Sequence, residues 1–175
     1  EDLVSPALYA TLSQSSTDPY NGPLEVLPCE TNGSFYIGNY TAKGKQVPFP
    51  AYYLITNGIG KSQKYPLRLP VGTYNVIYWG YPDYFGTTGD AYLADPTLII
   101  GKKLNTTSLG LRKIPGDTVY YPIHSLVYGT QNINIGKDDL QAHLKHASAA
   151  LSVIVSETNG DAFSDAIDSM WIYIS

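Results

Sequence analysis

The sequence predicts an all-β fold: an antiparallel β-sandwich of about seven to nine strands with one short helix near residues 136–147. Only 15% of the 175 residues are charged, whereas Tyr and Gly contribute 16 residues each and Pro 12. Tyr favours strands, and Gly and Pro favour turns, so this composition is unlike that of a helical protein. Apolar segments also recur about every ten residues, separated by Gly, Pro or Asn, which is typical of short consecutive strands. The length suits a single domain, 1–175.

The predicted strands are apolar or alternating segments bounded by turn residues. They are 7–12, 24–29, 34–41, 51–56, 64–69, 73–81, 97–100, 118–128, 149–156 and 169–174. Asn57-Gly58 is a strong signal for a hairpin turn. Segment 73–81 has the clearest strand pattern, and it is apolar on the face of Tyr78 and on the face of Trp79. We therefore expect a central strand that is covered on both sides.

Segment 136–147 breaks the strand pattern and predicts a helix of about three turns. Leu140, Leu144 and Ala147 fall at i, i+4 and i+7 and would form a narrow apolar stripe. Acidic residues stand in the first turn and basic residues in the last, as the helix dipole prefers. One short helix among many strands favours a sandwich with a single helical crossover.

The charge pattern excludes nucleic acid as a partner. The net charge is −4, and the chain has two arginines, Arg68 and Arg112, with no basic stripe to neutralise a phosphate backbone. No apolar run approaches the roughly 20 residues that a membrane-spanning helix needs. Glu1 is not an initiator methionine, so we expect a processed or trimmed N-terminus.

No pattern in the chain predicts a catalytic residue, a cofactor or a metal ion. There is no strand-to-helix serine elbow and no glycine-rich phosphate cradle. His143 and His146, with Asp139, have a spacing that could hold a metal on a helix, but a solvated helix flank is the better interpretation. Asp83, Asp90 and Asp95 lack the spacing of a calcium loop.

The single cysteine, Cys29, predicts neither a disulfide nor a reactive thiol. One cysteine cannot form an internal disulfide, so the fold must be held by its own core. Neither a nearby cation nor a helix N-terminus is present to lower its pKa. We interpret Cys29 as a small apolar residue at the end of a strand.

The last predicted strand is a candidate site for strand addition. Its apolar side chains alternate on both faces and it carries no charge, a pattern that invites pairing with another chain. The candidate edge consists of Ser169, Met170, Trp171, Ile172, Tyr173 and Ile174. Segment 3–12 is the second choice for this contact.

An aromatic cluster supports an alternative function, a surface glycan-binding module. Trp79, Tyr81, Tyr84 and Phe85 lie close together in the sequence WGYPDYF. Exposed rings beside polar groups can stack on sugars while the polar groups bind hydroxyls. The competing interpretation of the same residues is the end of a core strand followed by a Tyr-rich turn.

Three stretches resemble the fimbrillin-like proteins of Bacteroidetes, which are subunits and minor or anchoring components of lipoprotein-derived surface pili. LPVGTYNVIYWGY (69–81) is similar to their strand that ends in an aromatic-Gly pair. IGKDDLQAHLKHASAALSVIV (135–155) is similar to their helix-then-strand segment, and TVYYPIHSLVYG (118–129) to the strand before it. Together these stretches cover about the second half of the chain.

This resemblance implies a transthyretin-like sandwich without catalytic residues, at the cell surface, as an outer-membrane lipoprotein or part of a fimbrium. It implies a lipid on a cysteine just before Glu1, which would be the protein's only link to the membrane. The partners it implies are other pilus subunits, or copies of the same chain, bound by strand addition; host or microbial surface glycans or proteins are further candidates. Family members usually carry a second β-sandwich, so the chain is either a whole subunit or an N-terminal domain. Shaft subunits of the family are matured by a protease. A cut at Arg112-Lys113 would lie too late in the chain to release an N-terminal strand, which favours an accessory or anchor over a shaft subunit.

Overall fold

A computed structural model describes residues 2–12, 18–32, 34–48, 50–63, 65–82, 93–94, 98–106, 110–111, 116 and 126–147. In these residues the regular secondary structure is β-strand, and helical structure is limited to a short 3-10 turn, η2 (Leu104–Thr106). The strands are β1 (Leu3–Val4), β2 (Leu8–Leu12), β3 (Asp18–Pro19), β4 (Gly22–Cys29), β5 (Asn39–Tyr40), β6 (Gln46–Val47), β7 (Ala51–Thr56), β8 (Ile59–Ser62), β9 (Leu69–Pro70), β10 (Gly72–Gly80), β11 (Leu93–Ala94), β12 (Gly110–Leu111), β13 (Val127–Ile135) and β14 (Leu140–His146). The predicted all-β class is confirmed. Within the described ranges, no helix is long and apolar enough to cross a membrane.

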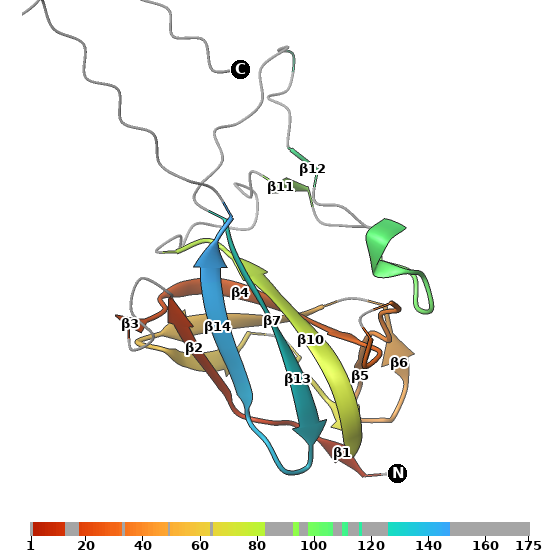
Figure 1. The fold of residues 1–175 in the computed structure, drawn as a ribbon. Helices are drawn as coiled ribbons and strands as arrows, with labels where there is room; N and C mark the ends of the chain where they lie inside the picture. Colours follow the sequence, from red (N-terminus) through yellow and green to blue (C-terminus); the bar gives the residue numbers. More distant parts are fainter. Residues whose placement is uncertain are drawn as a thin grey trace, which may run out of the picture.

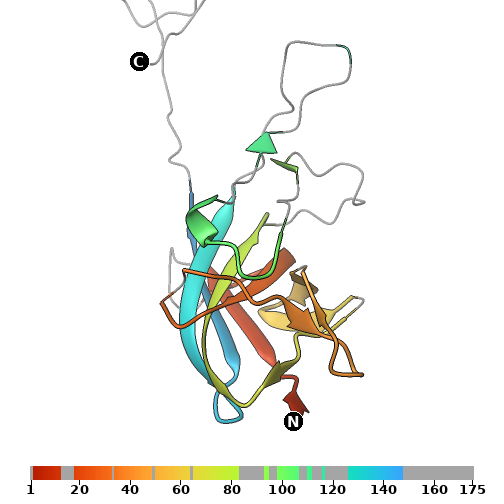
Figure 2. The same ribbon diagram turned by 90° about the vertical axis from the view of Figure 1, so that its right-hand side faces the viewer.

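The main sheet closes on itself as a barrel of seven strands, so the predicted sandwich is wrong (Figure 1). The strands follow the order β14-β13-β10-β4-β7-β8-β2, and β14 returns to pair with β2. That last pairing is parallel, from Leu140 beside Leu8 to Leu144 beside Leu12, and the other pairings are antiparallel. Closure occurs because the early strand β2 fills the gap beside the late strand β14, which removes two open edges. The short strand β3 extends β2 outside the ring, and the β5–β6 hairpin (orange in Figure 2) lies beside the barrel.

Strand β10 is the centre of the sheet, as its sequence predicts. It pairs with β13 along its whole length and with β4 from Asn75 to Gly80. Its inward side chains, Val76 and Tyr78, join the barrel core. Among the described residues, the buried side chains of that core are Leu8, Ala10, Tyr20, Leu24, Val26, Ala51, Tyr53, Ile55, Leu67, Leu69, Val76, Tyr78, Val127, Ile133, Ile135, Leu140, Ala142 and Leu144.

A second, smaller core covers the outer face of β4 and β10. Leu27 and Cys29 of β4 and Trp79 of β10 are buried there against Tyr36 and Leu98. The outer face is therefore apolar because other chain segments cover it, which confirms the prediction of a strand buried on both sides.

The predicted helix at 136–147 is wrong, because this segment is a hairpin turn followed by strand β14. Leu140, Ala142 and Leu144 are buried and the residues between them are exposed, so the apolar pattern has the period of a strand. Leu140 and Leu144 satisfy a helical spacing as well, and only pairing with β2 separates the two interpretations. Asp138 does not serve a helix dipole: its Oδ2 accepts a hydrogen bond from the Asn134 N–H at 3.0 Å, across the turn.

A glutamine side chain joins β13 to β14 where their backbone ladder stops. The two strands are paired at Val127 and Tyr128 only. Further along, Gln131 Oε1 accepts hydrogen bonds from the Gln141 N–H at 2.8 Å and from the Tyr78 hydroxyl at 2.7 Å. Burial raises the pKa of Tyr78, and the neighbouring Tyr53 adds to this effect. The hydroxyl therefore stays protonated and continues to donate to Gln131.

Other predicted elements have mixed outcomes. Asn57 and Gly58 form the predicted turn, each with positive φ, and join β7 to β8. Segment 34–41 is broken at Gly38, which has φ +73°, so it contributes single bridges and the short strand β5. In the predicted strand 64–69, two backbone N–H groups are bound by side chains: that of Leu67 donates to Tyr53 Oη, and that of Arg68 donates to Asn39 Oδ1. Only Leu69 of this segment joins a strand.

The remaining predicted strands lie wholly or partly outside the described residues. Residues 98–100 are described and form no strand. Of 118–128, only the end is described, where β13 begins. Segments 149–156 and 169–174 lie outside the described ranges, and the assignment of 1–175 to one domain stays a prediction.

Candidate functional site

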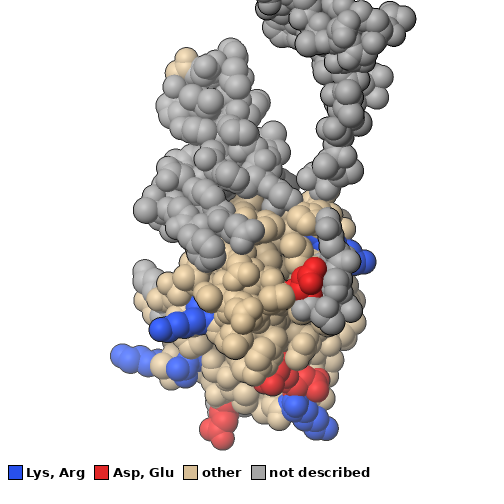
Figure 3. Space-filling model, turned by 90° about the vertical axis from the view of Figure 1, so that its left-hand side faces the viewer, with Lys and Arg blue, Asp and Glu red and all other residues tan. Residues whose placement is uncertain are grey.

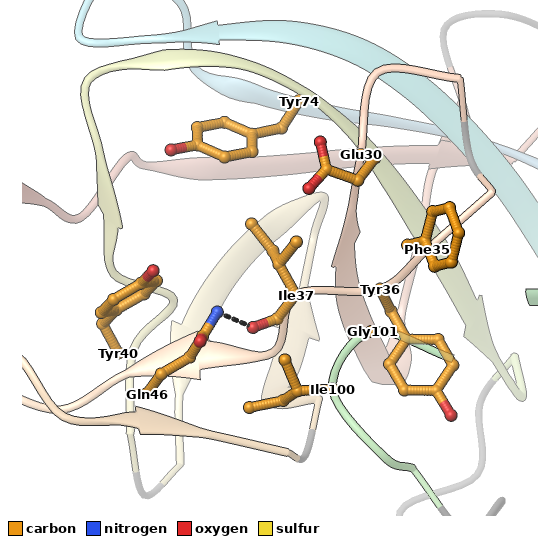
Figure 4. A pocket seen from close by; sticks show the side chains of 9 residues that line it. All are labelled: Glu30, Phe35, Tyr36, Ile37, Tyr40, Gln46, Tyr74, Ile100 and Gly101. Atoms are coloured by element: carbon orange, nitrogen blue, oxygen red, sulfur yellow. Dashed lines mark hydrogen bonds between the residues drawn. The ribbon is translucent and has the colours of Figure 1, made fainter. Parts of the chain in front are cut away.

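The described surface has a hollow beside the second core, which we call the Glu30 pocket (Figure 4). Its volume is about 410 Å³, which is enough for one large side chain or a small ligand. Four regions of the chain form its walls: the turn after β4 with the segment that follows, the β5–β6 hairpin, the beginning of β10, and the loop before η2. The lining residues are Glu30, Phe35, Tyr36, Ile37, Tyr40, Gln46, Tyr74, Ile100 and Gly101.

Hydrogen bonds hold these walls in place. The Glu30 N–H donates to the Phe35 carbonyl at 2.7 Å, and the Gly101 N–H donates to the Tyr36 carbonyl at 3.0 Å. The Gln46 side-chain amide donates to the Ile37 carbonyl, which ties the hairpin to the neighbouring wall (Figure 4). Because backbone groups carry most of these bonds, the pocket is formed by the fold itself.

The sequence did not point to this pocket. Its residues lie far apart in the chain, and although Tyr74 belongs to the stretch 69–81, that stretch indicates a strand and not a pocket. The one available signal was that Tyr40 and Tyr74 belong to a chain unusually rich in tyrosine, which does not indicate where the rings meet.

The first residue of the predicted glycan-binding cluster, Trp79, is not exposed for binding. Trp79 is only 8% exposed and belongs to the second core, so its ring faces are packed against protein. Tyr81 is half-buried. Tyr84 and Phe85 lie outside the described residues, and for them glycan binding stays a prediction.

The first-choice strand-addition edge, 169–174, also lies outside the described residues. In the second choice, 3–12, strand β2 has no free edge, whereas β1 is paired on one side only. Strand β1 pairs with β9, and β2 lies between β14 on one side and β8 and β3 on the other.

The histidines are not arranged as a metal site in the described ranges, where no group of three potential ligands lies together. Their predicted helical spacing does not apply in a strand, because residues three apart point to opposite faces. His143 points outward, with its Nδ1 3.0 Å from Thr11 Oγ1 on β2. Asp83, Asp90 and Asp95 lie outside the described residues.

Cys29 is the buried apolar residue that the sequence predicts, and we expect its thiol to be inert in the folded protein. Burial, and to a lesser extent the charge of Glu30, raises the pKa of the thiol to about 12. At pH 8 this lowers the thiolate fraction about a thousandfold relative to an ordinary cysteine. Reaction with Ellman's reagent should therefore be slow in buffer and fast in denaturant. Equal rates in both conditions would contradict the buried position.

Charged side chains are dispersed over the face of the molecule shown in Figure 3. On the face shown in Figure 3, Lys and Arg alternate with Asp and Glu around a broad uncharged area. No continuous basic patch appears on the described part of this face.

A comparison with protein-family models decides the family. The model of the fimbrillin-A associated anchor proteins Mfa1 and Mfa2 matches residues 2–175. The chain belongs to this family. The match extends over the whole described barrel, so it includes the first half of the chain, where the sequence motifs gave little guidance.

Membership in this family confirms the predicted relationship to fimbrillin-like surface proteins. The family is structural, and the chain is not an enzyme. Searches of curated proteins and of solved structures gave no match.

Proposed function

We propose that this protein is an anchor or accessory component that holds fimbriae at the bacterial cell surface through association with fimbrillin subunits. The observation that carries the proposal is the match of residues 2–175 to the anchor-protein family. If the protein is an anchor, deleting its gene should leave the filaments intact but release them into the medium. Filaments that remain on the cells in normal number would contradict the anchor role.

We propose strand addition as the means of association, with this chain as the donor. The closed barrel supports the donor role, since the pairing of β14 with β2 removes the two edges at which an incoming strand would otherwise bind. The donor segment would be 169–174, whose alternating apolar side chains suit a groove with pockets on one side.

A charge placed in this segment tests the mechanism. Ile172→Lys should reduce co-purification with fimbrillin at least tenfold, because a buried ammonium in an apolar pocket is strongly disfavoured. Ser175→Lys adds the same charge at the end of the segment and serves as the control. Circular dichroism should show that the barrel of both variants is folded. Unchanged co-purification of a folded Ile172→Lys variant would rule out this segment as the donor.

We also propose attachment to the outer membrane by a lipid on a cysteine upstream of Glu1. The fimbrial family supports a surface location, for which such an anchor is a sufficient device. Mass spectrometry of the protein isolated from its native cells should find an acylated N-terminus. An unmodified N-terminus would refute the lipid anchor and leave the fimbrial association to be tested separately.

A further inference from the structure

The Glu30 pocket combines aromatic walls with a single charge. Among the described residues of its lining, Glu30 is the only charged one, and the other side chains are aromatic, aliphatic or amide. Within the described part of the chain, the Glu30 carboxylate forms no ion pair. In Figure 4 the carboxylate points into the space between Tyr74 and Ile37, and Tyr40 stands on the opposite side. Glu30 is itself exposed, so its negative charge stands at the hollow open to solvent and to a ligand.

The neutral polar groups of the lining are largely used by the protein itself. The Tyr74 hydroxyl donates to the Pro70 carbonyl at 3.0 Å, and the Gln46 amide donates to the Ile37 carbonyl. The Tyr36 hydroxyl accepts from the Ile99 N–H at 2.9 Å. The Glu30 carboxylate only accepts hydrogen bonds, so it suits a ligand group that donates. Ammonium and guanidinium groups donate and also carry the opposite charge, which makes the hydrogen bond stronger than one from an uncharged sugar hydroxyl.

The rim of the pocket suits a side chain that carries its charge on an apolar stem. Phe35 is 36% exposed and Ile100 is 37% exposed, and both line the pocket. Lysine and arginine bury their methylene stems along such surfaces while the charged group reaches a polar partner. Aromatic rings add to the attraction when a cation lies within about 6 Å of the ring.

We propose that the Glu30 pocket binds a lysine or arginine side chain of a partner protein. The cation would pair with the Glu30 carboxylate between the rings of Tyr40 and Tyr74, and its stem would lie against Phe35 and Ile100. This site is separate from the segment proposed for strand addition, and it does not depend on that mechanism.

The test is a nuclear magnetic resonance titration of the ¹⁵N-labelled chain with Ac-Gly-Lys-Gly-NH₂. Two matched peptides, with acetyl-lysine or norleucine in place of lysine, keep the stem but lack the charge. The lysine peptide should shift the amides of Glu30, Ile37 and Gly101, and the uncharged peptides should not. Glu30→Gln should weaken binding about fivefold, as expected for the loss of one partly exposed ion pair. Asp139→Asn removes one negative charge from the β13–β14 hairpin and should have no effect.

Several outcomes would overturn the proposal. Equal shifts with the norleucine peptide would show an apolar site, and unchanged affinity in a folded Glu30→Gln variant would show that the carboxylate is not the partner. Tighter binding of N-acetylglucosamine at the same amides would identify a sugar site instead. The absence of shifts with lysine peptide up to roughly 50 mM would show that the pocket does not bind a cation.

Discussion

Trp79→Ala should lower the free energy of unfolding by about 3–5 kcal/mol, the usual cost of removing a large aromatic side chain from a core. Trp79 is 8% exposed and packs with Leu27, Cys29, Tyr36 and Leu98 on the outer face of the barrel. Its loss would leave a cavity between β10 and the covering segments, which cannot collapse far because hydrogen bonds fix them to the sheet. Urea unfolding followed by circular dichroism measures the change.

Tyr128→Ala provides the matched control for this substitution. Tyr128 lies directly opposite Trp79 in the β10–β13 ladder, but it is 48% exposed. Its truncation should cost no more than about 1 kcal/mol, because little buried contact is lost. If Trp79→Ala were as mild as Tyr128→Ala, Trp79 would not be a core residue, and the glycan-binding interpretation of its ring would regain support.

Gly80→Ala should be the second large effect, with a loss of about 3 kcal/mol or failure to fold. A Cβ at residue 80 would overlap the Pro23 carbonyl oxygen and lie 2.9 Å from the Tyr20 hydroxyl, which itself donates to that carbonyl at 2.8 Å. Because the overlap is with a backbone oxygen, no side-chain rotation can relieve it. Strands β4 and β10 would therefore have to move apart. Thermal unfolding of the purified variant measures the loss.

Gly44→Ala separates this overlap from the general cost of replacing a glycine. A Cβ at residue 44 meets nothing within 4 Å, but φ is +76°, so only backbone strain of about 1 kcal/mol is expected. A Gly80→Ala variant as stable as Gly44→Ala would mean that the two strands approach less closely there than the structure has them.

The fold could be predicted where a single strand pattern determined the outcome. Strands β2, β4, β7 and β10 were found because their apolar residues alternate or fill both faces between clear turn signals. The turn at Asn57-Gly58 was found for the same reason, since few residues accept positive φ.

The predictions failed where the structure of a segment depends on pairing with a strand far away in the sequence. Leu140 and Leu144 fit a helix and a strand equally well, and the choice depends on pairing with β2, more than 120 residues earlier. That same parallel pairing turns the expected sandwich into a barrel. The Glu30 pocket could not be predicted from the sequence for a related reason. Its walls come from separate regions of the chain that only folding brings together.

Immunogold electron microscopy of the native cells, with antibody raised to this domain, tests the fimbrial role most directly. If the protein anchors fimbriae, label should lie at the cell surface where the filaments begin, and little should lie along their shafts. Label spread over the cell body with no relation to filaments would contradict the anchor role, even though the chain belongs to the anchor-protein family.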